Sequence, residues 1–256
     1  MLEIIHRKKR LSSFKLIVLG FAGVIVLGAL ILMLPFSSTA GVVTPFHEAL
    51  FTSTSAVCVT GLVVQDTGSY WSAFGQTVIL LLIQIGGLGF MTVITTTLMV
   101  LGRKIGLYER KILMQSAGTM RLSGIVHLVR RITIGTAIFE GAGALLLATR
   151  LCPKLGFWEG LYSSVFHSVS AFCNAGFDLL GCYGEYNSLC GFEGDWTINL
   201  TISVLIIIGG LGFVVWDDIS RNKLAIKKYR LHSKIVLAVT AFLLVSGTAL
   251  FLIFEW

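Results

Sequence analysis

Phe51-Thr-Ser-Thr-Ser-Ala-Val-Cys-Val-Thr-Gly61 and Phe166-His-Ser-Val-Ser-Ala-Phe-Cys-Asn-Ala-Gly176 are the two stretches that decide the fold of this chain. They align at an offset of 115 residues, and six of their eleven positions are identical. A second pair, Ile85-Gly-Gly-Leu-Gly-Phe90 and Ile208-Gly-Gly-Leu-Gly-Phe213, follows in the same order at an offset of 123 residues. Ordered recurrence of this kind indicates an internal duplication.

The composition around these stretches is that of a membrane protein. Of the 256 residues, 55% are apolar and 13% charged, and the mean hydropathy is +0.86. Soluble domains carry about a quarter charged residues, so the composition argues strongly against a soluble globular protein. Apolar runs at 16–34, 76–101, 125–149, 197–216 and 234–254 approach the roughly 20 residues that one span needs, and they predict five membrane helices.

The first apolar run has an alternative interpretation as a cleaved signal peptide. Ser38-Thr-Ala40 behind it resembles a signal-peptidase site. However, its apolar region of about 19 residues exceeds the usual 7–15. We therefore expect a retained span.

The basic residues predict the orientation in the membrane. Of the 20 Lys and Arg residues, 18 fall before the first span, between the second and third, or between the fourth and fifth. By the positive-inside rule these segments and the N-terminus are cytoplasmic, in a multi-pass plasma-membrane protein. The net charge of +7 is thus explained by orientation, and no nucleic-acid partner is expected.

Two short semi-polar segments, 46–58 and 158–173, lie between the spans of each duplicated unit. At 1.5 Å per residue they reach only about 20–24 Å, so neither crosses a bilayer as a helix. Each is expected to enter the membrane partway and return, and Gly61 and Gly176 then allow the chain to turn. Carbonyl oxygens and negative helix C-termini facing one axis attract cations. The sequence therefore predicts a cation pathway, with duplicated structural hairpins as the alternative.

The predicted fold is an all-α polytopic membrane protein of tandem helix–re-entrant pore loop–helix repeats, with five transmembrane helices and two pore half-helices. Its expected parts are a basic N-terminus (1–15), repeat one (16–101, re-entrant loop 46–62), a linker (102–124), repeat two (125–216, re-entrant loop 158–177), a second linker (217–233) and the first helix of an incomplete third repeat (234–256).

The motifs also resemble a known family. Thr54-Ser-Ala-Val-Cys-Val-Thr-Gly-Leu62 and Phe166–Asp178 are similar to the first and second filter loops of the Trk/Ktr/HKT superfamily of potassium transporters. The whole chain, including Leu231-His-Ser-Lys-Ile235, is most similar to the membrane subunits of bacterial Ktr systems.

This resemblance implies potassium uptake, often sodium-dependent, with no organic cofactor and no metal site beyond potassium. It implies a homodimer and a cytosolic, nucleotide-binding regulatory ring (KtrA-like). Carried over residue by residue, Gly61 and Gly176 are filter glycines, and adjacent carbonyls come from Val59, Thr60, Asn174 and Ala175.

The resemblance also implies a pore of four repeats, whereas this chain carries two and the opening span of a third. We expect the chain to be either one part of a split transporter or a truncated product. In either case it would assemble with the missing repeats, or it would regulate a full-length transporter without conducting ions itself. Two copies that pair to supply four loops are the alternative.

Three of five notable acids have both a functional and a structural interpretation. Glu140 lies within the third span, where an ionisable group is functional by default, but a buried acid bonded to a neighbouring span is the alternative. Asp66 and Asp178 follow the filter loops and are candidates for the pore mouth, or else are solvated loop acids. Asp217 and Asp218 are expected to pair with Arg or Lys.

The cysteines and the polar motifs do not support catalysis. Cys58 and Cys173 occupy matching half-helix positions and are interpreted as packing residues, while Cys182 and Cys190 share an external loop where a disulfide is one option. No nucleophile–base set, phosphate loop or metal-spaced histidine cluster is evident in the sequence. The basic and apolar segment 103–124 is expected at the membrane surface, as a docking site for the partner or as a plain interfacial helix.

Overall fold

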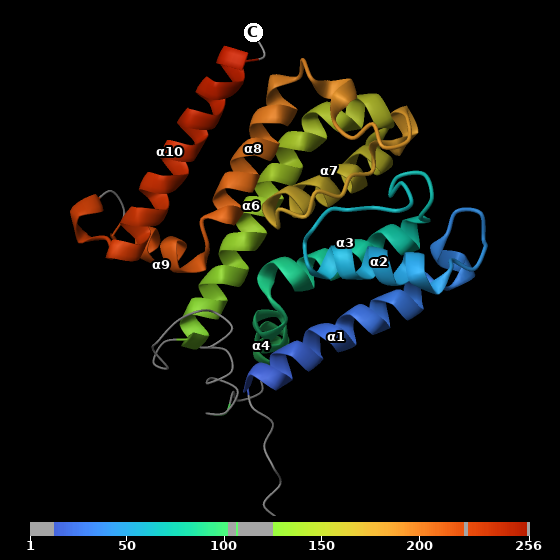
Figure 1. Cartoon of the computed structure of the whole chain (residues 1–256), viewed down its shortest axis with the longest axis horizontal. Coiled ribbons are helices and arrows are strands. Elements are labelled where there is room, and N and C mark those ends of the chain that lie inside the picture. The colour runs from blue at the N-terminus through green and yellow to red at the C-terminus, as the bar shows by residue number, and fades with distance from the viewer. Residues whose placement is uncertain (1–12, 102–105, 107–124, 223–224, 255–256) are drawn as a thin grey trace, which may run out of the picture.

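The computed structural model describes residues 13–101, 106, 125–222 and 225–254, and the regular elements there are all helices (Figure 1). The first half contains α1 (Ser13–Leu32), η1 (Pro35–Ser37), α2 (Phe46–Val57), α3 (Ala73–Leu88) and α4 (Phe90–Val100). The second half contains α6 (Ile125–Leu155), α7 (Phe157–Phe172), η2 (Leu180–Tyr183), η3 (Cys190–Phe192), α8 (Trp196–Gly210) and α9 (Phe213–Asn222). The last elements are η4 (Ile226–Lys228) and α10 (Leu231–Phe254). The predicted N-terminal segment 1–15 and linker 102–124 fall almost wholly outside the described residues.

The described part has the apolar helices of a multi-pass membrane protein. Three helices are long and apolar enough to cross a bilayer, namely α1, α6 and α10. The pairs α3–α4 and α8–α9 raise this number to five when each pair counts as one span. In contrast, α2 and α7 have 12 and 16 residues and are too short to cross. The predicted all-α polytopic fold is confirmed.

The two glycine-rich runs are each broken into two helices, which the sequence did not predict. The axes of α3 and α4 are bent by 101°, and those of α8 and α9 by 95°. The last glycine of each duplicated motif causes the break, because Gly89 has φ +80° and Gly212 has φ +84°. A left-handed residue interrupts the helical hydrogen-bond pattern, and glycine adopts that conformation without a Cβ penalty.

The two halves use the same packing scheme. α1 packs against α2 and α3, and α6 packs against α7 and α8. α3 also contacts α7, which joins the halves. The main core includes Leu32, Ile79, Ile83 and Phe166, each with essentially no exposed surface. The short helices α2 and α7 are therefore held between longer helices (Figure 1).

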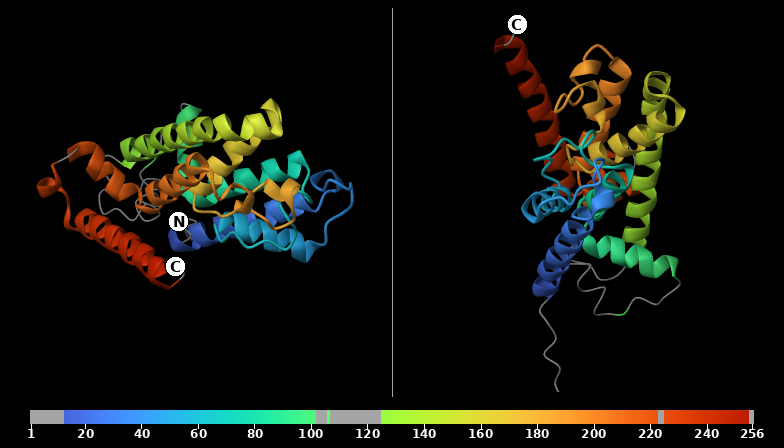
Figure 2. Two further views of the ribbon diagram at one scale, coloured as in Figure 1. Left: turned by 90° about the horizontal axis from the view of Figure 1, so that it is seen from above. Right: turned by 90° about the vertical axis from the view of Figure 1, so that its right-hand side faces the viewer.

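Two further helices bear on the sites below. α6 runs to Leu155, beyond the predicted end at 149, and tolerates Pro153 in its last turn before Gly156 turns the chain at φ +91°. α10 contacts α9 but stands apart from α6 and α8 (Figure 2). Ser233 is its buried residue, and its apolar side chains are exposed or half-buried.

Candidate functional site

Each short helix ends in a turn of the same geometry. The backbone N–H of Cys58 donates to Thr54 at 2.8 Å, and that of Cys173 donates to Val169 at 2.9 Å, which closes the last helical turn. The next residues, Val59 and Asn174, have φ of +57° and +59°. Two residues later Gly61 and Gly176 have φ of +75° and +76°. A β-branched valine at positive φ is uncommon and marks a conformation imposed by its surroundings.

The peptide groups in these turns have a defined direction. The backbone N–H of Thr60 donates back to the Ser55 carbonyl at 2.9 Å, and that of Ala175 donates back to Ser170 at 2.7 Å. In a trans peptide the C=O points opposite to the N–H of the same unit. The carbonyls of the preceding residues, Val59 and Asn174, therefore point away from their helices.

The two turns meet each other. A Cβ placed on Gly61 would lie 2.5 Å from the Ala175 carbonyl oxygen and 3.2 Å from the Cα of Gly176. Gly176 in turn approaches the Cα of Gly61. Ala175 is buried, Val59 and Gly61 are half-buried, and the other predicted filter residues, Thr60, Asn174 and Gly176, are exposed. The structure thus brings together the six residues that the sequence singles out.

A serine hydroxyl holds each short helix to the preceding long helix. Ser53 Oγ donates to the carbonyl of Ile25 in α1 at 2.7 Å. Ser168 Oγ donates to the carbonyl of Glu140 in α6 at the same distance. Both serines are fully buried, and both bonds occur at equivalent positions of the repeat.

A glycine one turn further along the long helix makes this approach possible. A Cβ on Gly28 would lie 2.5 Å from the hydroxyl of the first serine, and a Cβ on Gly143 would lie 2.5 Å from that of the second. The same Cβ atoms would crowd Leu82 and Leu205 at 2.8 and 2.6 Å. We call each set of serine, carbonyl and glycine the helix clamp. The sequence comparison missed both clamps, although Gly28 and Gly143 share the offset of 115 that relates the serines.

The duplicated glycine motifs of α3 and α8 support the ends of the short helices. Gly86 packs on the Val57 carbonyl and Gly209 on the Phe172 carbonyl, so closely that neither position has room for a Cβ. Gly87 packs against Cys173 of the other half. These glycines fix the C-terminus of each short helix by backbone contact.

The two predicted mouth acids differ in environment. Asp66 is 5% exposed and accepts hydrogen bonds from the backbone and hydroxyl of Ser69, both at 2.8 Å, and from the backbone of Tyr186 at 3.0 Å. It therefore joins the loop that follows α2 to the loop that follows α7, and the interpretation as a solvated loop acid is wrong for this residue. Asp178 is half-buried and accepts from the Leu180 N–H at 3.0 Å.

Asp178 lines a cavity of about 250 Å³ beside the second turn, together with Asn174 and His167. His167 Nδ1 lies 2.7 Å from the Ser163 carbonyl, and Nε2 lies 3.4 Å from the Leu179 backbone N–H. Such partners suit a neutral ring that donates at Nδ1 and accepts at Nε2. The cavity thus carries several polar oxygen and nitrogen groups next to Gly176, within walls that are otherwise apolar and include Phe177 and Ile202.

Glu140 adopts the structural one of its two expected arrangements. Gln84 Nε2 in α3 donates to both carboxylate oxygens, at 3.1 and 3.3 Å. The side chain therefore bridges the halves, while its backbone carbonyl belongs to the second helix clamp.

The remaining predicted residues lie away from the turns. The expected pairing of Asp217 is confirmed, since it contacts Arg131 at 2.8 Å and Arg221 at 3.0 Å. Asp218 accepts instead from Asn222 and from the backbone of Arg230. Cys190 is a free thiol, so no disulfide joins it to Cys182, whose side chain lies outside the described ones.

The chain is similar in sequence to known cation transport proteins. Residues 13–256 match the TrkH family model, described as a cation transport protein. The chain is 43% identical to the potassium/sodium uptake protein NtpJ of Enterococcus hirae over 97% of its length and 54% of that protein. It is 42% identical to the Ktr system potassium uptake protein B of Bacillus subtilis over 91% of its length and 51% of that protein. It is also 36% identical to the protein of that name from Vibrio alginolyticus, over 94% of its length and 52% of the relative. The chain thus spans about half the length of these relatives.

Proposed function

Because this chain belongs to the TrkH family of cation transport proteins, we propose that it supplies two of the loops through which potassium crosses the membrane during uptake. The backbone oxygens of residues 59–61 and 174–176 replace part of the ion's hydration shell. The single observation that carries this proposal is the outward direction of the Val59 and Asn174 carbonyls at the point where the two turns meet.

The short helices contribute to the same site. The C-terminus of an α-helix carries partial negative charge, and both α2 and α7 end directly before these turns. A cation between the turns is attracted by both helix ends and by the carbonyl oxygens. Asp178 adds a carboxylate near the second turn. Asp66 holds together the two loops that follow the short helices.

Potassium is the proposed ion, with sodium as a second or coupled ion. This choice rests on the relatives, which are named potassium and potassium/sodium uptake proteins. No organic cofactor takes part in the proposal. The chain is a member of a transporter family, and we propose no enzymatic activity for it.

Two loops line only part of a closed filter. We propose that further loops come from additional repeats, either in a continuation of the polypeptide or in a separate chain, while pairing of two copies is the alternative source. The basic segments face the cytoplasm in this proposal, and a nucleotide-binding regulatory ring contacts the membrane protein there.

The test is a glycine substitution in each turn. Gly61→Asp and Gly176→Asp place a side chain where the turns touch, and they should abolish rubidium uptake or relax its preference over sodium, in potassium-uptake-deficient cells expressing the complete assembly. Gly41→Asp is the matched control, because Gly41 also has positive φ (+68°) but has open space around it. Unchanged rubidium uptake in both filter variants would refute the assignment.

We propose a second function beside this one. In this alternative the chain does not conduct and instead assembles with a longer transporter. Rescue of the potassium-uptake-deficient strain by this chain alone supports conduction. Absence of rescue, with co-purification of the chain and a longer relative, supports the alternative.

A further inference from the structure

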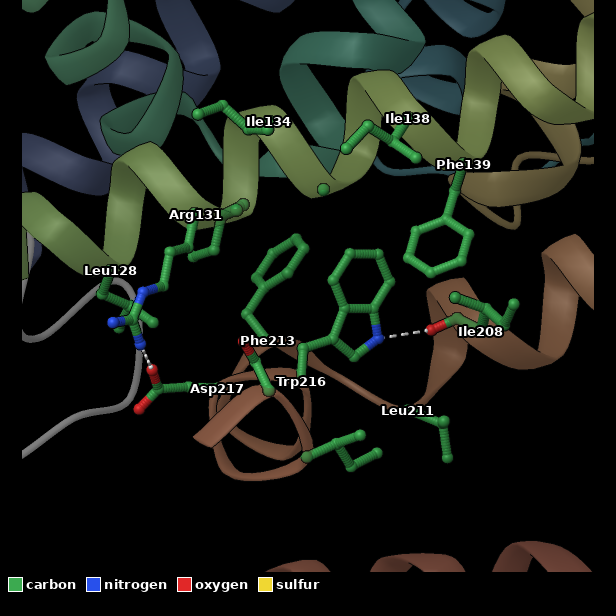
Figure 3. A pocket seen from close by; sticks show the side chains of 14 residues that line it. Leu128, Arg131, Ile134, Ile138, Phe139, Ile208, Leu211, Phe213, Trp216 and Asp217 are labelled. Atoms are coloured by element: carbon green, nitrogen blue, oxygen red, sulfur yellow. Dashed lines mark hydrogen bonds and ion pairs between the residues drawn. The ribbon is translucent and has the colours of Figure 1, made fainter. Parts of the chain in front are cut away.

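The bend between α8 and α9 leaves a cavity of about 430 Å³ on the outside of the second half (Figure 3). Its walls are α6, the end of α8 and the first two turns of α9. It is separate from the filter turns, and none of the six filter residues lines it. What occupies this cavity is therefore a question apart from the ion pathway.

The walls of the cavity are mainly apolar, and some of the side chains that form them are exposed on the surface of the protein. Ile134 and Ile138 of α6 are 49% and 62% exposed. Phe139 and Trp216 lie edge to face with ring centroids 5.0 Å apart, and Phe213 lies at the same wall. In a membrane protein such a surface faces lipid chains or other apolar helices.

The indole N–H of Trp216, a polar group in this wall, already has a hydrogen-bond partner. Trp216 Nε1 donates to the Ile208 carbonyl at 2.9 Å, as Figure 3 shows. That carbonyl lies four residues before Gly212, where the helix breaks. The indole thus leaves only its rings facing the cavity, and an occupant needs no hydrogen-bonding group there.

One end of the cavity carries a net positive charge. Asp217 is 7% exposed and is shared by Arg131 and Arg221, so that two guanidinium groups meet one carboxylate. The arginine side chains remain 51% and 54% exposed. Guanidinium groups bind phosphate oxygens in bidentate fashion, so this pair is suited to a phosphate at the rim.

The charged and apolar parts are spaced like those of a lipid. Arg131 and Phe139 are eight residues apart on α6, which is about 12 Å along the helix. Half the hydrocarbon thickness of a bilayer is about 15 Å. A headgroup at Arg131 therefore places its acyl chain along the apolar wall as far as Phe139.

We propose that this cavity binds an anionic glycerophospholipid from the leaflet on the side of the basic segments, with its phosphate at Arg131 and Arg221 and one acyl chain against Trp216. An extended peptide segment fits less well, because its backbone amides would find few hydrogen-bonding partners along the apolar wall. A zwitterionic lipid lacks the net negative charge that the rim favours.

Trp216 provides a direct assay, because bromine atoms on an acyl chain quench a neighbouring indole. The chain is reconstituted with Trp158, Trp196 and Trp256 replaced by Phe, which leaves Trp216 and the buried Trp71. Vesicles contain phosphatidylglycerol or phosphatidylcholine, each dibrominated on the acyl chain, at increasing mole fraction. We expect half-maximal quenching at about fivefold lower mole fraction for phosphatidylglycerol, the factor that one charge contributes at a membrane surface.

Two variants with matched controls separate the headgroup from the chain. Arg131→Gln should remove the preference for phosphatidylglycerol, whereas Arg130→Gln on the neighbouring exposed residue should keep it. Ile138→Phe should weaken quenching by both lipids, whereas Leu145→Phe, also on α6 and 69% exposed, should not. Unchanged total tryptophan emission in vesicles without brominated lipid shows that each variant is folded.

Three results would overturn the proposal. The first is equal quenching by both lipids, and the second is quenching that Ile138→Phe leaves unchanged. The third is an absence of quenching while cross-linking shows two copies joined through α6, which would assign the cavity to a second chain.

Discussion

The helix clamps give the sharpest test of the structure, because each has a matched control on its own helix. A Cβ on Gly28 would lie 2.5 Å from Ser53 Oγ and 2.8 Å from Leu82, and a Cβ on Gly143 meets equivalent atoms. Gly23 in α1 and Gly141 in α6 have open space around them. We predict that Gly28→Ala and Gly143→Ala destabilise the protein, whereas Gly23→Ala and Gly141→Ala do not.

The magnitude follows from two opposing effects. Alanine in place of glycine within a helix stabilises by up to about 1 kcal/mol, and this gain applies to all four variants. Overpacking costs about 1–3 kcal/mol and applies only to Gly28 and Gly143. The difference between each variant and its control is therefore about 1–3 kcal/mol. At about 2–4 °C per kcal/mol for a chain of this size, the thermal midpoints should differ by about 2–12 °C.

The assay is thermal unfolding of the purified protein in detergent, and the serines supply a second arm. Ser53→Ala and Ser168→Ala each remove one buried hydrogen bond, which should cost about 1 kcal/mol. In the double variant Gly28→Ala/Ser53→Ala the hydroxyl no longer opposes the new methyl group, so the two costs should be less than additive. Equal midpoints for Gly28→Ala and Gly23→Ala, or strict additivity, would refute the clamp.

Three further predictions concern the bends and the contact between the halves, each measured by thermal unfolding. Gln84→Leu removes both hydrogen bonds to the Glu140 carboxylate, whereas Glu140→Gln keeps a polar partner for Gln84. Gln84→Leu should therefore lower the thermal midpoint more than Glu140→Gln. A larger loss for Glu140→Gln would contradict the proposed bridge. Trp216→Phe leaves the Ile208 carbonyl without the indole N–H and should cost about 1–3 kcal/mol, whereas an unchanged midpoint would show that the bend does not need it. Gly212→Ala should destabilise the protein by only about 1 kcal/mol. Its φ of +84° is unfavourable for alanine, but no atom lies within 4 Å of the new Cβ. A loss of more than about 3 kcal/mol would indicate steric crowding at this position.

The sequence was sufficient for the fold class because the bilayer makes the pattern simple. Apolar runs of about 20 residues locate the helices, and segments too short to cross stand out between them. The duplication added the positions of the turns, since Gly61 and Gly176 occur at equivalent places. The all-α membrane fold and the family were therefore predictable from these features.

The bends and the clamps were not predictable in the same way. The third glycine of each motif has positive φ, but hydropathy is unchanged across it, so the runs 76–101 and 197–216 read as single spans. The clamp acceptors are backbone carbonyls, which carry no residue identity that a sequence pattern could reveal. Asp66 illustrates a third limit, because its burial depends on Tyr186, far away in the chain.

The use of a main-chain acceptor in the clamps has a consequence for how duplicated units can diverge. A backbone carbonyl oxygen is the same group whatever side chain its residue carries. That residue can therefore be substituted while the hydrogen bond from the serine hydroxyl is kept. The first copy carries isoleucine there and the second carries glutamate, which reaches Gln84 of the copy before it. In an arrangement of near-identical units the order of neighbours is ambiguous, and a polar contact present at only one junction can specify it. This position therefore allows one repeat to be distinguished from the next while the architecture of each stays the same.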